Sequence, residues 1–374
     1  MTAEADPSIR PRRVPGRAIE PPPGCGRGDH LWFGSELHAL GTTLFVQAPI
    51  GAPHDDSEDR PAICVAEMDG GAPDWRSTVE LPFDEMGRSR FFSIAAHGDH
   101  LAVSYRGNEG CEGVHLHRRI DDAWPAVGHV EPPEGRSQTD FGEPLVFAGD
   151  LLITGSLPGV ELPHSALRAY RHVGDELREV GGLPVPPGAT SFGGHLAASP
   201  SGQWLAAVTT HGERELAVEL YARRDDAYGH VQTLFSAGEI RSLAVSDDHL
   251  AFGVLAREGA DGGGWVQTYR LDGGAWREDR RLSPPDGGDP YPPGFSVAIH
   301  GHRLAISQPL ANTIFVVDLG SDADTTWCQL APTPDPGSRA FTGGSLAWVG
   351  NTLFASSRAR RFYAFDTEGC FDEP

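Results

Sequence analysis

The stretch Gly98–Val127, "GDHLAVSYRGNEGCEGVHLHRRIDDAWPAV", alternates apolar segments with polar turns and places Trp124 just before its last apolar segment. The same order returns in Ala217–Val231, "AVELYARRDDAYGHV", and in Gly264–Leu282, "GWVQTYRLDGGAWREDRRL". Each copy runs from an apolar segment through an acidic or Gly-rich turn to a Trp or Tyr and a further segment. Short apolar runs bounded by turn residues predict β-strands rather than helices.

The turn that opens this pattern recurs along the whole chain. Aligned on it, the copies place their turns at Gly41, Gly98, Gly149, Gly202, Asp247, Gly301 and Gly350, a spacing of 45 to 57 residues. Gly or Asp at such a point supplies the positive φ that a tight hairpin needs. A unit of four short strands repeated at this period predicts an all-β fold, a seven-bladed β-propeller with four antiparallel strands per blade.

The first strand of each unit is rich in small residues, and the fourth begins with an aromatic residue. The first strands read "LHAL", "IAAH", "LVFA", "LAAS", "LAVS", "VAIH" and "LAWV". The aromatic positions are Trp75, Trp124, Tyr228, Trp276 and Trp327, with Leu177 in the same position of the third unit. We expect the small residues where blades crowd at the axis, and the aromatic side chains packed between blades.

The last unit has only three strands before the chain stops at "EGCFDEP". Near the N-terminus, "GRAIEPPPG" resembles the fourth strands "VGHVEPPEG" and "REVGGLPVPPG". We therefore expect Arg17–Pro22 to supply the outer strand of the last blade, which would remove an open sheet edge. The predicted organisation is an N-terminal segment, 1–27, and one propeller domain, 28–374, with blades at about 28–88, 89–139, 140–190, 191–238, 239–289, 290–338 and 339–374.

Composition narrows the function classes. With 52 acidic and 30 basic residues the net charge is -22, which argues against nucleic acid and against an anionic membrane surface. The five cysteines, at 25, 64, 111, 328 and 370, contain no CxxC pair and predict neither a disulfide framework nor a zinc site. A Cys25–Cys370 bond in particular would have to cross a strand of roughly 25 Å. The N-terminus lacks an apolar signal segment, so we expect a cytoplasmic protein, or an extracellular one if a leader has been removed.

"FGSELHALGTTLFVQAP", "GDHLAVS" and "GDLLITGS" resemble FG-GAP repeats, the integrin-α-like propeller repeats common in bacterial proteins. The resemblance covers about residues 28 to 370, and the Phe-Gly pair survives at Phe33-Gly34, Phe141-Gly142 and Phe192-Gly193. It implies a seven-bladed propeller used for adhesion or protein binding, often with calcium. No unit carries the spaced acidic calcium loop of those repeats.

Two groups of residues are candidate metal ligands. Asp55, Asp56 and Asp59 lie in "GAPHDDSEDR" and can gather oxygen ligands for calcium, although a charged loop tip is also simply solvated. The histidines form close pairs, His97 with His100, His115 with His117, and His300 with His302. Each pair offers two ligands to a transition metal without an obvious third, and turn or strand-surface roles explain the pairs as well.

The first functional hypothesis is a non-enzymatic protein-binding or scaffold module, whose partner carries a basic patch to match the acidic chain. The connections between second and third strands vary most in length and polarity. They and the connection 284–294 supply the predicted ligand-binding residues His54, Asp55, Asp59, Arg60, Arg106, Asn108, His164, His211, Arg214 and Tyr291.

Two alternatives remain open. A lectin would need the aromatic series exposed as sugar platforms, whereas packing is expected for it. A hydrolase or lyase would need titratable residues near the axis, where the first strands offer Glu36, His38 and His195. No nucleophile elbow, HExxH or P-loop motif occurs, so we predict no catalytic residues.

Overall fold

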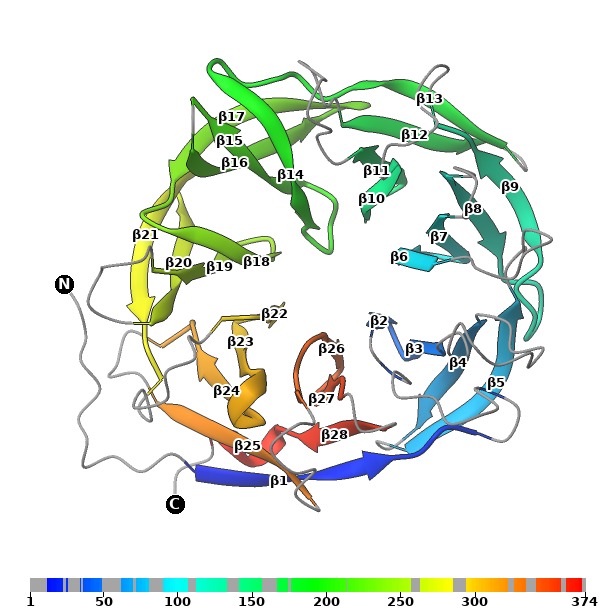
Figure 1. The fold of residues 1–374 in the computed structure, drawn as a ribbon, viewed down its shortest axis with the longest axis vertical. Helices are drawn as coiled ribbons and strands as arrows, with labels where there is room; N and C mark the ends of the chain where they lie inside the picture. The colour runs from blue at the N-terminus through cyan, green and yellow to red at the C-terminus, as the bar shows by residue number, and fades with distance from the viewer. Residues whose placement is uncertain are drawn as a thin grey trace. The chain divides into compact units, whose positions relative to one another are not determined.

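The computed structural model describes residues 12–22, 25, 34, 36–48, 62–69, 72–80, 90–106, 112–132, 141–156, 167–173, 176–212, 214–256, 263–284, 294–321, 326–333, 341–357 and 361–371. Within these ranges the chain forms 28 β-strands and two three-residue 3-10 helices, so the predicted all-β class is confirmed (Figure 1). Neither of these short helices has the length or the apolar character needed to cross a membrane.

The chain divides into two compact units, 1–52 with 62–76 and 237–374, and 53–61 with 77–236. The second unit contains three four-stranded sheets, which we call blades 2 to 4. Blade 2 is β6 (Arg90–His97), β7 (His100–Arg106), β8 (Glu112–Arg118) and β9 (Ala126–Val130); blade 3 is β10 (Phe141–Ala148), β11 (Leu151–Ser156), β12 (Arg168–Val173) and β13 (Glu176–Gly182); blade 4 is β14 (Ala189–Ala198), β15 (Trp204–His211), β16 (Glu215–Arg224) and β17 (Ala227–Phe235).

The first unit contains blades 5 to 7 and blade 1, whose last strand runs on beyond residue 76. Blade 1 is β2 (Leu37–Leu40), β3 (Thr43–Ala48), β4 (Ala62–Asp69) and β5 (Ala72–Glu80); blade 5 is β18 (Glu239–Val245), β19 (His249–Leu255), β20 (Gly264–Asp272) and β21 (Ala275–Leu282); blade 6 is β22 (Val297–His300), β23 (Arg303–Gln308), β24 (Thr313–Asp318) and β25 (Trp327–Thr333); blade 7 is β26 (Leu346–Val349), β27 (Thr352–Ala355), β28 (Phe362–Asp366) and β1 (Arg12–Ile19). The 3-10 helices are η1 (Pro309–Ala311) and η2 (Glu368–Cys370).

Turn chemistry explains why neighbouring strands pair. Positive φ occurs at six predicted turn positions, Gly41, Gly98, Gly149, Gly202, Gly301 and Gly350. At the seventh, around Asp247, a serine organises the turn instead, since Ser246 Oγ accepts the backbone N–H of His249 at 2.9 Å. Asp121 and Asp225, one residue of each acidic pair in the quoted stretches, also have positive φ and therefore serve as turn residues.

The N-terminal strand β1 completes blade 7, as predicted. Its residues Arg17–Ile19 pair antiparallel with Ala364–Phe362 of β28. The strand begins earlier and ends earlier than the expected Arg17–Pro22, because Arg12–Arg17 also pair in parallel with Cys328–Thr333 of β25. β1 therefore joins blades 6 and 7 into one eight-stranded sheet, and it lies along both β25 and β28 in Figure 1.

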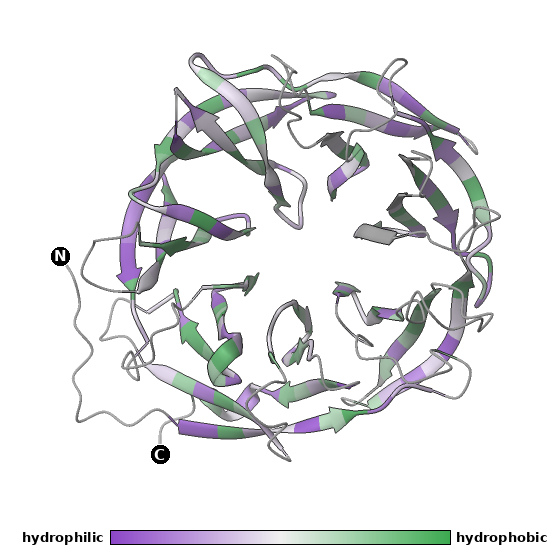
Figure 2. Cartoon of the chain, in the orientation of Figure 1, coloured by the Kyte–Doolittle hydropathy of each residue, from purple (hydrophilic) through white to green (hydrophobic). Residues whose placement is uncertain are grey.

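The core lies between the sheets, and the aromatic series belongs to it. Four of its members are buried: Trp124, Tyr228, Trp276 and Trp327 are each less than 9% exposed, and the partly buried Trp75 packs on the cluster around Phe362. Within a blade, most of the apolar residues lie on the inner strands. Figure 2 shows β24 mostly hydrophobic and the outer strand β21 mostly hydrophilic. Packing is therefore the role of these aromatic side chains.

A glycine stands where the first strand of a blade meets the preceding blade. Gly142 in blade 3 and Gly343 in blade 7 have φ of +95° and +91°. A Cβ on Gly343 would lie 2.8 Å from Ser307 Cβ of blade 6, and one on Gly142 would overlap Ser104 of blade 2. The glycine of the Phe-Gly pair at 141–142 is thus required both by backbone conformation and by the close approach of two blades.

The cysteine prediction was wrong, because four of the five cysteines form two disulfides. Cys25 bonds Cys64 of β4, with Cα atoms 6.2 Å apart, and Cys328 of β25 bonds Cys370 of η2, with Cα atoms 5.5 Å apart. Each bond spans about forty residues of sequence, so spacing alone could not reveal it. Cys25 and Cys370 are not joined to each other, as expected.

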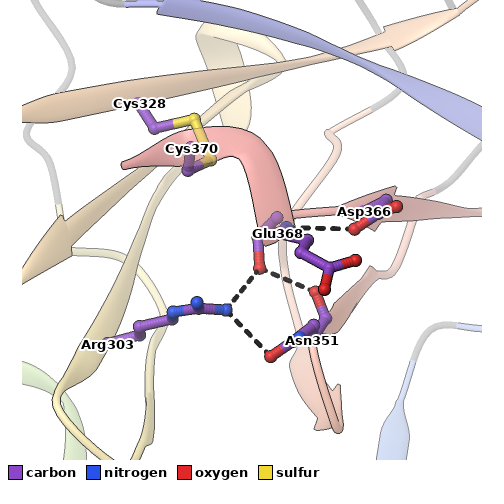
Figure 3. Close-up of a disulfide and its surroundings, with 7 residues drawn as sticks. Arg303, Cys328, Asn351, Asp366, Glu368 and Cys370 are labelled. Carbon is purple, nitrogen blue, oxygen red and sulfur yellow. Dashed lines mark hydrogen bonds between the residues drawn. A yellow bond between two sulfur atoms is a disulfide. The ribbon is translucent and has the colours of Figure 1, made fainter. Parts of the chain in front are cut away.

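The C-terminal turn is held by side chains as well as by its disulfide (Figure 3). Arg303 Nη1, from blade 6, donates to Asn351 Oδ1 at 3.0 Å and to Thr367 Oγ1 at 3.4 Å. Thr367 Oγ1 in turn donates to the carbonyl of Asn351 at 2.6 Å. Strand β1 and the C-terminal turn are therefore tied to blades 6 and 7 by strand pairing, hydrogen bonds and the Cys328–Cys370 disulfide.

Candidate functional site

Most of the predicted binding residues lie outside the described part of the chain. This holds for His54, Asp55, Asp56, Asp59, Arg60, Asn108, His164 and Tyr291. Arg106 ends β7, and only its backbone is described. His211 and Arg214 are described, and they lie at and just beyond the end of β15 in blade 4.

His211 belongs to a polar network built around Glu219, which is wholly buried in the middle of β16. Glu219 Oε1 accepts from His211 Nε2 at 2.6 Å and from Thr209 Oγ1 at 2.9 Å. Glu219 Oε2 accepts from His230 Nε2 and from Thr233 Oγ1, both at 2.7 Å. Three adjacent strands, β15, β16 and β17, therefore converge on one carboxylate.

The network satisfies the carboxylate fully. Each oxygen receives two hydrogen bonds, and both imidazoles lie at ion-pair distance, which offsets the large penalty of burying a negative charge. The neighbouring Tyr221 donates to the carbonyl of Pro184 at 3.1 Å, and burial, followed by the charge of Glu219, raises the pKa of its phenol. The bond to Glu219 therefore fixes the orientation of the His211 ring.

The outer side of this network reaches the surface at the end of blade 4. The ring of Phe235, 59% exposed at the end of β17, lies edge-on to the His211 ring with centroids 5.2 Å apart. Arg214 is exposed in the adjacent connection between β15 and β16. The Phe235 ring and the Arg214 side chain are therefore exposed at the end of blade 4 where the second and third strands connect.

A second aromatic feature lies at the corresponding end of blades 6 and 7. Phe295 is 43% exposed and meets the half-buried Phe341 edge to face, with centroids 5.0 Å apart. Phe341 has φ of +50°, a conformation that bulky residues rarely adopt. Leu310 of η1 is also exposed, at 42%. We call Phe295 and Phe341 the aromatic patch.

The position of the phenylalanine relative to the nearby positive-φ glycine differs between blades. In blade 3 Phe141 precedes its positive-φ glycine and is buried, and Phe192 of blade 4 is buried as well. In blade 6 Phe295 instead follows the positive-φ Gly294, and in blade 7 Phe341 precedes Gly343 by two residues. The shifted rings lose the core position of Phe141 and reach solvent.

A cavity of about 600 Å³ lies in the first unit, lined by residues of blade 7, β1 and blade 1. Its charged lining residues are Arg17, Asp366 and Glu368, and each of these is exposed. Asp366 Oδ1 accepts the backbone N–H of Glu368 at 3.0 Å (Figure 3). None of the predicted site residues lines this cavity.

The structure does not bring the other candidate residues from the sequence together into a site within the described ranges. In the described ranges no group of three or more His, Cys, Asp or Glu side chains is placed to hold a metal ion. His38 and His195 are half-buried on first strands of two different units, and the half-buried Glu36 directly precedes the strand that holds His38. Sequence reasoning missed Glu219, although its place inside the apolar run "AVELY" marks it as a buried charge.

Comparison with protein-family models finds no match, and none of the curated proteins matches either. Among solved structures, a chain of "Crystal Structure of Mitotic Checkpoint Complex" aligns with a TM-score of 0.57 and 14% identity, covering 98% of this chain and 96% of that chain. The β-propeller domain of Cps50 (Swd1) from Myceliophteria thermophila aligns with a TM-score of 0.54 and 10% identity, covering 90% of this chain and 99% of that chain.

The Pseudomonas aeruginosa periplasmic gluconolactonase PpgL aligns with a TM-score of 0.52 and 19% identity, covering 79% of this chain and 85% of that chain. The fold is a seven-bladed β-propeller. At these identities the likeness shows the fold alone, and it includes both an enzyme and a chain from a protein complex. The predicted propeller is confirmed, whereas no match supports the FG-GAP family itself.

Proposed function

We propose that this chain is a non-enzymatic protein-binding module, with one contact surface at the aromatic patch of the first unit and another at Phe235 of the second unit. The observation that carries this proposal is the exposure of Phe295 and Phe235, each of which meets a second ring edge to face. Aromatic anchors that become buried on binding supply much of the binding energy of protein interfaces. The unusual backbone of Phe341 fits a segment shaped for contact rather than for packing.

Three further points support this proposal over the alternatives. Four rings of the aromatic series are buried, so they offer no sugar platforms for a lectin. The buried Glu219 network has all its acceptors satisfied and leaves no group free for acid or base chemistry. The neighbour in the mitotic checkpoint complex is consistent with protein binding. The acidic chain favours a partner with a basic patch.

The two disulfides support the extracellular alternative for location. Structural disulfides persist in oxidising compartments and are rare in the cytosol. We therefore propose that the chain works in an oxidising compartment, where both disulfides persist. Thiol counting on the protein purified from its native source under alkylating conditions tests this: one free thiol is expected, and five would contradict it.

The binding proposal is tested with the double variant Phe295→Ala/Phe341→Ala and the single variant Phe235→Ala. Each protein is immobilised and used to capture partners from the native source, with quantitative mass spectrometry. The matched control is Ile120→Ala, because Ile120 is 53% exposed but lies in the turn between β8 and β9 at the other end of a blade. A partner that the wild-type chain and the control retain, and that the Phe variants lose, supports the proposal. Equal capture by all variants rejects it.

A further inference from the structure

Two histidines meet at the junction of blades 2 and 3, far in sequence from one another. His100 opens β7 directly after the turn at Gly98, and His172 lies near the end of β12. Their ring centroids are 4.0 Å apart, with an angle of 52° between the ring planes. The sequence pairs His100 with His97 across the turn, and the fold adds a third imidazole, that of His172, from the next blade.

The orientation of His100 is set by a carboxylate. His100 Nδ1 lies 2.8 Å from Asp99 Oδ1, and Asp99 Oδ2 accepts from Arg118 Nε at 2.9 Å. Since Nδ1 donates to the carboxylate, the neutral ring carries its lone pair on Nε2. A carboxylate behind a histidine is the usual support of a metal-binding imidazole, because it fixes both the tautomer and the ring orientation.

The Nε2 atoms of these two histidines are buried without hydrogen-bond partners. Neither His100 Nε2 nor His172 Nε2 has a hydrogen-bond partner among the described protein atoms, although both are shielded from solvent. Burial, followed by the positive charge that His172 can carry, lowers the pKa of His100, which keeps the ring in the neutral form that binds metals. Two buried lone-pair donors of this kind are costly to leave unsatisfied.

We propose that His100 and His172 bind one first-row transition-metal ion through their Nε2 atoms, with water completing the coordination. Zn²⁺, Ni²⁺ and Cu²⁺ are the ions that imidazole ligands favour, whereas Mg²⁺ and Ca²⁺ prefer oxygen. Because one ligand comes from each blade, the ion would clamp blade 2 to blade 3. The site needs no third protein ligand, because water molecules fill the remaining coordination positions of the ion.

The chain contains its own control for this site. Blade 5 repeats the dipeptide as Asp248-His249, with His249 Nδ1 2.9 Å from Asp248 Oδ1 and a buried, unpartnered Nε2. In blade 6, Leu319 occupies the position that His172 occupies in blade 3. In blade 3, Leu151, two residues after the turn glycine, pairs with Arg171, and His172 follows Arg171. In blade 6, Arg303, two residues after the turn glycine, pairs with Asp318, and Leu319 follows Asp318. Leu319 has no ligand atom, so we expect no metal site there.

The test uses the untagged full chain after EDTA treatment and dialysis. Equilibrium dialysis against Zn²⁺ and, separately, Ni²⁺ measures the metal bound by the wild-type chain, His172→Leu, His100→Leu and His249→Leu, with Mg²⁺ as the negative ion. We expect the wild type and His249→Leu to hold one more equivalent than the two junction variants, whose affinity at this site falls at least about tenfold. Thermal unfolding should shift upward with metal only where the site is intact.

Equal metal uptake by the wild type and His172→Leu overturns the proposal, as does an equal loss in His249→Leu. Circular dichroism in EDTA checks that each variant is folded. If the junction variants do not fold, metal affinity is measured for Asp99→Asn instead, because this variant keeps both imidazoles and removes the carboxylate that orients His100. A fall in affinity of about tenfold then supports the site, and unchanged affinity rejects it.

Discussion

Glu219→Gln keeps the shape of the buried side chain in blade 4 but removes its charge and one of its two acceptor oxygens. The amide nitrogen that replaces Oε1 or Oε2 cannot accept, so two of the four donors, one imidazole and one threonine hydroxyl, lose their acceptor. The other two bonds lose the strength that the negative charge gave them. We therefore expect the substitution to destabilise the fold.

The magnitude follows from these contacts. A hydrogen bond to a charged group contributes about 1.5–3 kcal/mol, so the loss of two such bonds costs about 3–6 kcal/mol. Relief from burying a carboxylate offsets part of this, which leaves a net loss of about 3 kcal/mol. The unfolding entropy of a chain of 374 residues is about 0.8 kcal/mol per kelvin, so the midpoint of thermal unfolding should fall by about 4 °C.

Scanning calorimetry at pH 7 measures the midpoint for the wild type, Glu219→Gln and Glu215→Gln. Glu215 begins the same strand and is exposed, so its substitution removes one charge without touching the network. We expect the control to unfold within about 0.5 °C of the wild type, since exposed charges contribute little. A Glu219→Gln midpoint within about 1 °C of the wild type, or an equal fall in the control, would refute the role assigned to the network.

Three further predictions follow from single features of the fold. Burial, and then the charges of His129 and His117, lower the pKa of His115 from 6.5 to about 4. Because the unfolded chain takes up this proton at a higher pH than the folded chain does, about 1–2 kcal/mol of stability should be lost as pH falls from 6.5 to 4. His115→Leu should flatten the plot of unfolding midpoint against pH, and an unchanged slope would count against this role of His115. Cys328→Ser should lower stability by about 4 kcal/mol, because the disulfide closes a loop of about 42 residues, and a thermal midpoint equal to that of the wild type would contradict this. Gly343→Ala forces a methyl group to within 2.8 Å of Ser307 at positive φ, so it should destabilise by at least about 2 kcal/mol in urea unfolding, whereas Gly350→Ala at an open turn should cost about 1 kcal/mol.

The candidate site was only partly visible in the sequence. His211 was named because it lies in a polar connection, and the structure gives it a role through Glu219 and Phe235. Loop composition could not show that Phe295 and Phe341 reach solvent, because their exposure depends on where each stands relative to a positive-φ glycine. The histidine pair of blades 2 and 3 was half visible, since His100 stands beside its turn and His172 comes from the next repeat.

The sequence by itself determined the strands, their turns, the number of repeats and the use of β1 to complete the last blade. These features are local or periodic: alternation of apolar residues, turn glycines and a recurring aromatic position are written within each unit of about fifty residues. Only the tertiary structure decided the disulfide partners, the second pairing of β1 with β25, the burial of Glu219 and the meeting of His100 with His172. Each of these depends on which side chains two separately built strands or sheets bring face to face, and no local pattern in the sequence encodes that distance.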